Sequence, residues 1–207
     1  MNLSYPARTV VPSLASEVLL ALAGTTRPLT GRQVHRLTHG TSWSGVRLVL
    51  QNLEASGLAD VFQAGSASLY TLNREHVAAE AVLALVDLRG KLFELIRHEF
   101  HGWTEPPLAA AVFGSAARGD GTVDSDIDVF IVRPEHLIAE DPVWSDAVAS
   151  LAHRIRRLSG NPASIIQATP AQIRAMVDRG EPILVELRRD LIHLYGLGVL
   201  DFSADDR

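Results

Sequence analysis

A glycine and serine pair, set between two short apolar runs, is the feature that most limits what this chain can fold into. The pair is Gly114-Ser115; residues 109–113 lie before it and residues 129–132 after it. Each run has the length and composition of a buried strand. Glycine has no Cβ, so a turn at this pair can bring backbone N–H groups close to an anion. The segment therefore predicts a strand, an anion-binding turn and a second strand.

Two aspartates stand at the start of the second apolar run. Asp126 and Asp128 are separated by Ile127, and the two-residue period of a strand places both carboxylates on one face with Ile127 on the other. Mg²⁺ prefers oxygen ligands and commonly binds through one or two carboxylates together with substrate phosphates. The aspartates and the turn therefore predict a site for a nucleoside triphosphate carried as its complex with Mg²⁺ or Mn²⁺.

This segment resembles the minimal nucleotidyltransferases of the DNA polymerase β type, whose signature is Gly-Ser, a spacer, then Asp-x-Asp. The residues 118–120 and Ser125 also agree with the family pattern. The resemblance implies a small domain with a mixed sheet and flanking helices. It implies that a nucleoside monophosphate passes from ATP or another nucleoside triphosphate to a hydroxyl acceptor. It also implies two groups of residues: the catalytic, metal-binding Asp126 and Asp128, and the nucleotide-binding Gly114, Ser115, Arg118 and Ser125.

The sequence departs from this family at one position. The family's third carboxylate lies on the strand after the helix and deprotonates the attacking hydroxyl. Ser164, or alternatively Gln167, stands there, and neither accepts a proton near neutral pH. Catalysis then needs a metal-bound hydroxide or the substrate itself as the base. The alternative is a domain that binds nucleotide without transferring it.

The first third of the chain predicts a separate helical module. Ser13 or Ser16 and then Thr30 are suited to cap the first two helices, a third helix follows residues 40–42, and two short strands follow at 58–63 and 68–72. Residues 12–74 resemble the winged helix-turn-helix of bacterial transcriptional regulators. The resemblance implies that the third helix enters the major groove of double-stranded DNA, through Ser42, Ser44, Arg47 and Gln51. Dimerisation or docking of a protein is the alternative use of such a module, so a homodimer is included among the expected assemblies.

The expected fold class is α/β (α+β), in three segments. Residues 1–75 form the winged helix-turn-helix, residues 76–104 a connecting helix and residues 105–207 the nucleotidyltransferase domain. A continuous helical pattern from Glu75 to His101 supports the connecting helix. The rest of the last segment predicts helices at 142–159, 171–177 and 182–190 and strands at 163–168 and 191–195.

Charge and composition narrow the function further. The net charge is −5, yet residues 1–75 carry six arginines against four acidic residues, so the excess positive charge lies in the first third. The chain contains no cysteine, which excludes disulfides. No apolar run reaches the length of a membrane helix, and the first residues lack the pattern of a signal peptide. We therefore expect a cytoplasmic protein with no membrane partner.

Two functions follow from these patterns. The first is a nucleotidyltransferase that modifies a protein, a nucleic acid or a small molecule; minimal members of the family often act as antitoxins that modify a partner toxin. The second is a transcriptional regulator whose C-terminal domain senses nucleotide without catalysis.

Overall fold

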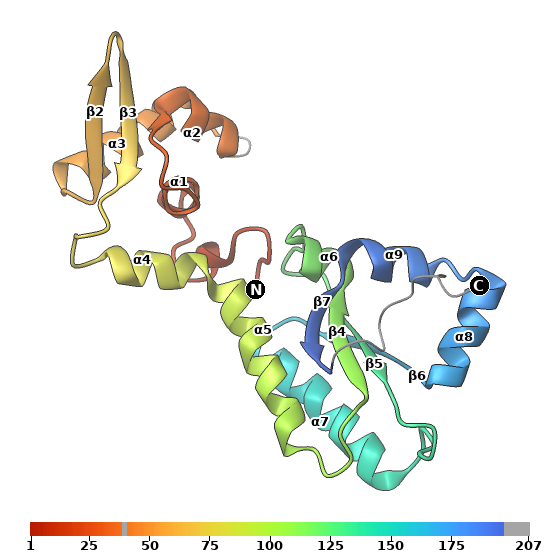
Figure 1. Ribbon diagram of the computed structural model, residues 1–207. Coiled ribbons are helices and arrows are strands. Elements are labelled where there is room, and N and C mark those ends of the chain that lie inside the picture. The colour runs from red at the N-terminus through yellow and green to blue at the C-terminus, as the bar shows by residue number, and fades with distance from the viewer. Residues whose placement is uncertain (39–40, 197–207) are drawn as a thin grey trace. The chain divides into compact units, whose positions relative to one another are not determined.

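The computed structural model describes residues 1–38 and 41–196 and divides into two compact units (Figure 1). One unit comprises Asn2 and residues 4–89, and the other comprises Met1, Leu3 and the chain from Gly90 onward. Residues 197–207 of the predicted segment 105–207 lie outside the described residues. Within the described ranges, every helix is too short or too polar to cross a bilayer.

The N-terminal unit is built on three helices after a short 3-10 turn, η1 (Pro6–Thr9). Helix α1 spans Leu14–Ala23, α2 spans Gly31–Leu37 and α3 spans Trp43–Ala55. Thr30 caps α2 by accepting from the N–H of Gln33, whose side chain accepts in return from the N–H of Thr30. The predicted helices and the Thr30 cap are confirmed.

A three-stranded antiparallel sheet completes this unit. Strand β1 (Leu29–Thr30) pairs with β3 (Ala67–Leu72), which pairs with β2 (Ala59–Ala64). The β2–β3 hairpin closes one residue nearer its turn than the sequence predicted, since Ala64 pairs with Ala67. Apolar side chains from the helices and the sheet form one core, which includes Val18, Leu22, Val34, Val46 and Leu50. The assignment of this unit as a winged helix-turn-helix stays a prediction.

The segment predicted as one connecting helix contains two helices. Helix α4 spans Ala79–Val86 and α5 spans Leu88–Glu99, with Asp87 between them and the 3-10 turn η2 (Phe100–Gly102) at the end. Val82 of α4 belongs to the core of the N-terminal unit, whereas Ile96 of α5 belongs to the core of the other. Each helix follows its own core, so the apolar pattern is continuous although the helix is not.

The second unit is organised around a four-stranded mixed sheet in the order β6-β5-β4-β7. Strand β5 (Ile127–Val132) runs antiparallel to β4 (Ala109–Phe113) and parallel to β6 (Ala163–Ala168). The last strand, β7 (Ile192–Tyr195), pairs antiparallel with β4. The mixed sheet and the α+β class expected from the sequence are confirmed.

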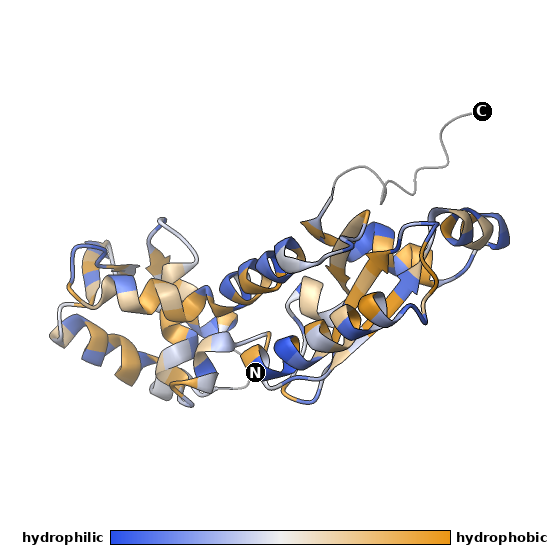
Figure 2. Cartoon of the chain, turned by 90° about the horizontal axis from the view of Figure 1, so that it is seen from below, coloured by the Kyte–Doolittle hydropathy of each residue, from blue (hydrophilic) through white to orange (hydrophobic). Residues whose placement is uncertain are grey.

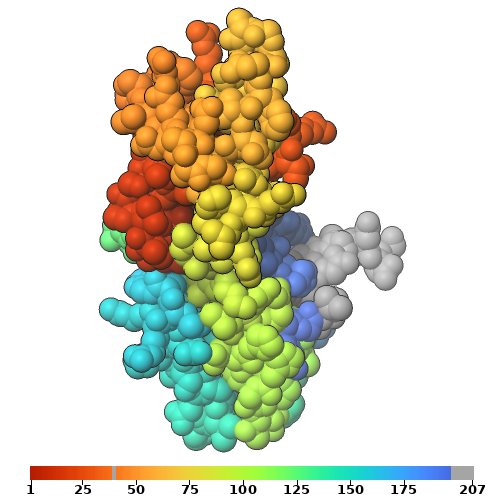
Figure 3. Space-filling view, turned by 90° about the vertical axis from the view of Figure 1, so that its left-hand side faces the viewer, coloured from red at the N-terminus to blue at the C-terminus, as the bar shows by residue number. Residues whose placement is uncertain are grey.

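Helices cover both faces of this sheet. Helices α5 and α7 (Pro142–Ser159) pack on one face, in the core that contains Ile127 and Val129. Their outer surfaces lie side by side in Figure 3. Nε of Arg154 on α7 donates to Oε1 of Glu99 on α5 over 2.9 Å. Helices α8 (Pro170–Arg179) and α9 (Ile183–Asp190) pack on the other face, with Phe113 and Phe130. The strands between them are strongly apolar (Figure 2), which is the pattern of a sheet buried on both sides.

Candidate functional site

The turn after β4 is shaped by one close contact. Gly114 has a φ of +66° and begins the short helix α6 (Gly114–Arg118). A Cβ added to Gly114 would lie 2.6 Å from Oδ2 of Asp128, because Phe113 pairs directly with Asp128 across the β4–β5 hairpin. Both the left-handed backbone and the closeness of the carboxylate require glycine here. The register of one hairpin thus brings the predicted turn and one predicted carboxylate together.

The two aspartates of the motif differ in exposure. Asp126 is exposed just before β5, whereas Asp128 is half-buried on the strand. Burial raises the pKa of the Asp128 carboxyl, and the negative charges of Asp126 and Glu186 raise it further, while Arg118 opposes them. Glu186 comes from α9 and was not among the residues predicted for the site. The result is a concentration of negative charge beside Gly114.

This charge fits a divalent cation held by few protein ligands. Ionised carboxylates that repel one another are stabilised when a cation lies between them. Among residues 1–38 and 41–196 there is no group of three or more histidine, cysteine or acidic side chains arranged to hold a metal. Asp126 and Asp128 are the two carboxylates of the motif that could hold such a cation, with water or substrate phosphates as its other ligands, as is usual for Mg²⁺.

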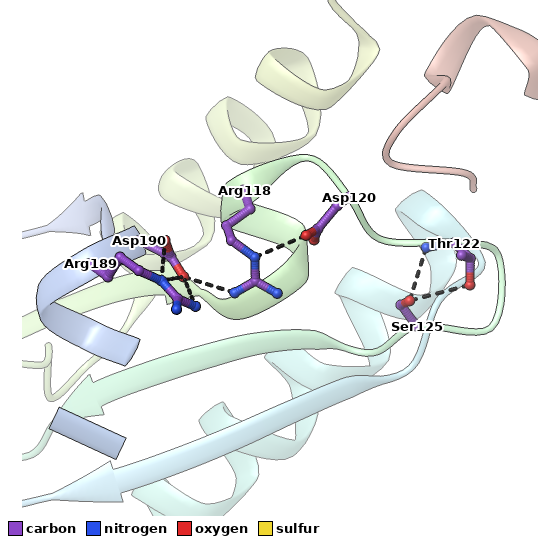
Figure 4. Close-up of polar contacts among 6 residues, drawn as sticks. All are labelled: Arg118, Asp120, Thr122, Ser125, Arg189 and Asp190. Atoms are coloured by element: carbon purple, nitrogen blue, oxygen red, sulfur yellow. Dashed lines mark hydrogen bonds and ion pairs between the residues drawn. The ribbon is translucent and has the colours of Figure 1, made fainter. Parts of the chain in front are cut away.

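Arg118, predicted to bind nucleotide, is held by two acidic side chains (Figure 4). Its Nε donates to Asp120 over 3.0 Å and its Nη1 donates to Asp190 over 2.8 Å. Asp190, at the end of α9, also accepts from Arg189. Its hydrogen bonds to Arg189 and Arg118 lower the pKa of the Asp190 carboxyl. Arg118 thus links α6, which begins at the glycine, to the end of α9.

Ser115 and Ser125, also predicted to bind nucleotide, occupy different settings. The carbonyl oxygen of Ser115 accepts from the N–H groups of Gly119 and Asp120 at 2.9 and 3.2 Å, closing α6. The hydroxyl of Ser125 accepts from the N–H of Thr122 over 2.9 Å and so shapes the loop before Asp126 (Figure 4). Ser115 therefore closes the short helix that begins at Gly114, and Ser125 supports the loop that leads to Asp126.

A buried amide that the sequence analysis missed supports the same loop. Asn161 is fully buried, and its Nδ2 donates to the carbonyl oxygens of Thr122, Val123 and Ser125 at 3.1, 3.3 and 2.9 Å. Its Oδ1 accepts from the amino group of Met1. Asn161 precedes β6, so it ties the start of that strand to the loop before Asp126.

The part of the chain that carries the turn and both aspartates is similar to a known protein family. Residues 97–175 match the nucleotidyltransferase domain family. The matched range contains β4, α6, β5, α7 and β6, and thus the turn and both aspartates. The match supports nucleotidyl transfer as the general activity of this part of the chain. Searches of curated proteins and of solved structures found no match.

The pairing of β5 with β6 separates the two residues considered for the third carboxylate. Ser164 pairs with Asp128 in the parallel β5–β6 register, so both side chains lie on the same face of the sheet. Gln167 lies on the opposite face, where its Oε1 accepts from Nε1 of Trp144 over 2.6 Å. Ser164 is therefore the residue of β6 that adjoins Asp128, and it carries no carboxylate.

Outside the matched range, the four predicted DNA-binding residues lie on α3 or at its start. Ser42 caps the helix by accepting from the N–H of Gly45 over 3.1 Å, and Ser44, Arg47 and Gln51 are exposed. A hollow between α2, α3 and the β2–β3 hairpin adjoins them; its lining includes Arg32, Trp43, Arg47, Ser66 and Tyr70. The face is open to solvent and carries both polar and apolar side chains, Trp43 among them.

Glu186 and Asn161 could not be recognised from local pattern alone. The sequence predicted the helix at 182–190, and Glu186 precedes Asp190 by one helical turn. That spacing places both on one face of the helix but does not say what the face meets. Asn161 lies in a short link between a helix and a strand, where polar residues are ordinary.

Proposed function

We propose that this protein transfers a nucleoside monophosphate from a nucleoside triphosphate, bound with Mg²⁺ or Mn²⁺, to a hydroxyl group. The close approach of Gly114 and Asp128 is the main observation behind the proposal. It brings a turn suited to phosphate next to a carboxylate suited to a cation, since a Cβ on Gly114 would lie 2.6 Å from Oδ2 of Asp128. The match of residues 97–175 to the nucleotidyltransferase domain supports the reaction class.

The residues have distinct tasks in this proposal. The turn at Gly114-Ser115 binds the phosphate oxygens of the triphosphate through its backbone N–H groups. Asp126 and Asp128 would hold the cation, which would neutralise charge on the departing pyrophosphate. The acceptor oxygen forms a bond to the α-phosphorus while the bond to the β-phosphate oxygen breaks. The acceptor hydroxyl belongs to a protein, a nucleic acid or a small molecule, and a toxin modified by its antitoxin is one such protein acceptor.

A double substitution tests the site assignment. Asp126→Asn combined with Asp128→Asn should abolish magnesium-dependent binding of ATP, measured by calorimetry, because both metal ligands lose their charge. Asp124→Asn is the matched control, since Asp124 is exposed in the same loop and should leave the affinity unchanged. Unchanged affinity in the double variant would refute the site.

Label transfer tests the reaction. Incubation with ATP labelled at the α-phosphate should place label on an acceptor or on the protein itself, with release of pyrophosphate. The double variant should give no label. Binding of ATP without release of pyrophosphate would point instead to a nucleotide sensor.

A nucleotide-sensing regulator that binds double-stranded DNA is the second candidate. Arg32, Arg36 and Arg47 border the hollows of α2 and α3, and within the described part of the chain none has an ion-pair partner. Unpaired arginines are available for phosphate and base contacts. The excess of arginine over acidic residues in this third of the chain supports the same use.

Measurements of DNA affinity with and without ATP test this candidate. Arg47→Ala should weaken binding and reduce the dependence on salt by about one unit of the log–log slope. Arg27→Ala removes the same charge elsewhere in the unit and serves as the control. Equal affinities of the two variants would argue against docking through α3.

A further inference from the structure

Strand β6, which pairs with the strand of Asp128, provides no carboxylate to accept the proton of the attacking hydroxyl. A hydroxyl that attacks phosphorus must lose its proton, and a carboxylate within reach accelerates that transfer. Ser164 is the residue of β6 on the face of Asp128, and Gln167 is bonded to Trp144 on the other face. A carboxylate suited to the task must come from another element.

Helix α9 is packed against the site. Leu184 and Leu187 are buried in the same apolar cluster as Phe113, the residue before Gly114. The bond between Arg118 Nη1 and Asp190 Oδ2, 2.8 Å long, fixes the end of α9 to the end of α6 (Figure 4). Apolar packing and an ion pair thus hold this helix in one position relative to the glycine turn.

The helical period then places Glu186. Glu186 lies four residues before Asp190, so the two side chains share a face of α9, about 6 Å apart along the axis. That face contacts α6 through Asp190. The charge of Glu186 also contributes to the raised pKa of Asp128, so the two carboxylates interact. Unlike Asp128, Glu186 is exposed and accessible to a bound substrate.

We propose that Glu186 accepts the proton of the acceptor hydroxyl during nucleotidyl transfer, a role that rests on the proposed function. The proton passes from the hydroxyl to a carboxylate oxygen of Glu186. The freed oxygen bonds to the α-phosphorus, the bond to the β-phosphate oxygen breaks, and pyrophosphate leaves with that electron pair. The carboxylate is supplied by a helix after the sheet instead of by β6.

Two other assignments fit less well. Asp190 shares the face of Glu186, but its carboxylate is bonded to Arg118 and Arg189, its pKa is lowered and its side chain is 7% exposed. A carboxylate engaged in this way is a weak proton acceptor. Glu186 as a third metal ligand is not supported, because the described residues contain no group of three side chains placed to hold a metal.

The test compares Glu186→Gln with Asp178→Asn, which removes one exposed charge from α8 of the same unit. The readouts are the rate of pyrophosphate release from Mg·ATP, with water as the nucleophile, and the Kd of Mg·α,β-methylene-ATP. Glu186→Gln should lower the rate about 100-fold or more and leave the Kd within about twofold. Glu186→Asp, which keeps a shorter carboxylate, should give an intermediate rate. Asp178→Asn should match the wild type in both.

The possible failures are distinct. A full rate in Glu186→Gln, with none in the Asp126 and Asp128 double variant, overturns the role of Glu186 and leaves the proposed function intact. A fall in rate explained entirely by a higher Kd overturns it as well, because the residue then serves binding alone. A wild type that binds the analogue through Asp126 and Asp128 but neither releases pyrophosphate nor transfers the α-phosphate label to an acceptor overturns both the role and the transfer reaction.

Discussion

The side-chain amide of Asn161 donates a hydrogen bond to the backbone carbonyl oxygen of Ser125, with 2.9 Å between Nδ2 and the oxygen. Ser125 directly precedes Asp126, and the same Nδ2 also donates to Thr122 and Val123. One buried amide therefore holds the loop that leads to the exposed aspartate of the site.

Replacement of Asn161 should weaken both the fold and the loop. Asn161→Ala leaves a cavity and removes hydrogen bonds from a fully buried position, so the free energy of unfolding should fall by about 2–3 kcal/mol. Urea denaturation measures the loss, and hydrogen exchange should quicken in residues 122–126. Asn161→Asp should also destabilise, since a carboxylate would repel the carbonyl oxygens. Unchanged exchange in the loop would contradict this account.

Substitution of Gly114 should damage the site more than the fold. Alanine at a φ of +66° costs about 1–2 kcal/mol, and its Cβ would lie 2.6 Å from Oδ2 of Asp128. A flexible carboxylate moves more easily than backbone, so Asp128 should be displaced and affinity for Mg·ATP lost. Gly180→Ala is the matched control, because Gly180 has a φ of +62° with nothing near its missing Cβ. Equal Mg·ATP affinity in the two variants would contradict the role of the contact.

The raised pKa of Asp128 has a consequence for stability without metal. A carboxyl whose pKa is raised by folding stabilises the protein below the ordinary value of 3.8, and this contribution is lost as pH rises through the higher folded value. Asp128→Asn should therefore be more stable than the wild type at pH 7 in chelator, by up to about 1 kcal/mol, since solvent screens a half-buried group. The difference should vanish near pH 3. Thermal unfolding at several pH values measures it; a constant difference would contradict the electrostatic cause.

New carboxylates on β6 should distinguish its two faces. Ser164→Asp adds a negative charge beside Asp128, since adjacent strands lie about 4.8 Å apart, and should raise the affinity for Mn²⁺ severalfold. Gln167→Glu places a charge beside buried Trp144 instead, so it should destabilise the protein and leave Mn²⁺ affinity unchanged. Calorimetric titration with Mn²⁺ measures both. An equal gain in the two variants would contradict the assignment of faces.

Elements with a strong local signal were predicted closely. Strand β4, helix α7 and strand β6 have the residue bounds expected from their apolar periodicity and caps. Thr169 caps α8 with Pro170 in its first turn, an arrangement of residues that favours the start of a helix. In each case the determining interactions lie within a few residues along the chain, so a single sequence contains them.

Features that depend on distant residues were not predicted. The break at Asp87 arises because α4 and α5 belong to different cores, and a periodic pattern does not record which core a helix enters. Glu186 is 58 positions beyond Asp128 in the sequence, and its influence on that carboxyl becomes visible only in the folded sheet. The sequence predicted the helix at 182–190, but it did not predict that the acidic face of this helix lies near Asp128.

The pairing of Phe113 with Asp128 limits which insertions and deletions the sequence can accept during evolution. A shift of the hairpin register by a single residue would turn Asp128 toward the apolar core under α5 and α7, and would turn Ile127 to the opposite face of the sheet. Insertions before Thr122 lie beyond the paired strand positions and beyond the carbonyl oxygens that Asn161 holds, so they leave the strand register intact. Relatives of this protein should therefore vary in length there, whereas a shift of the two strands by one residue should be absent among them.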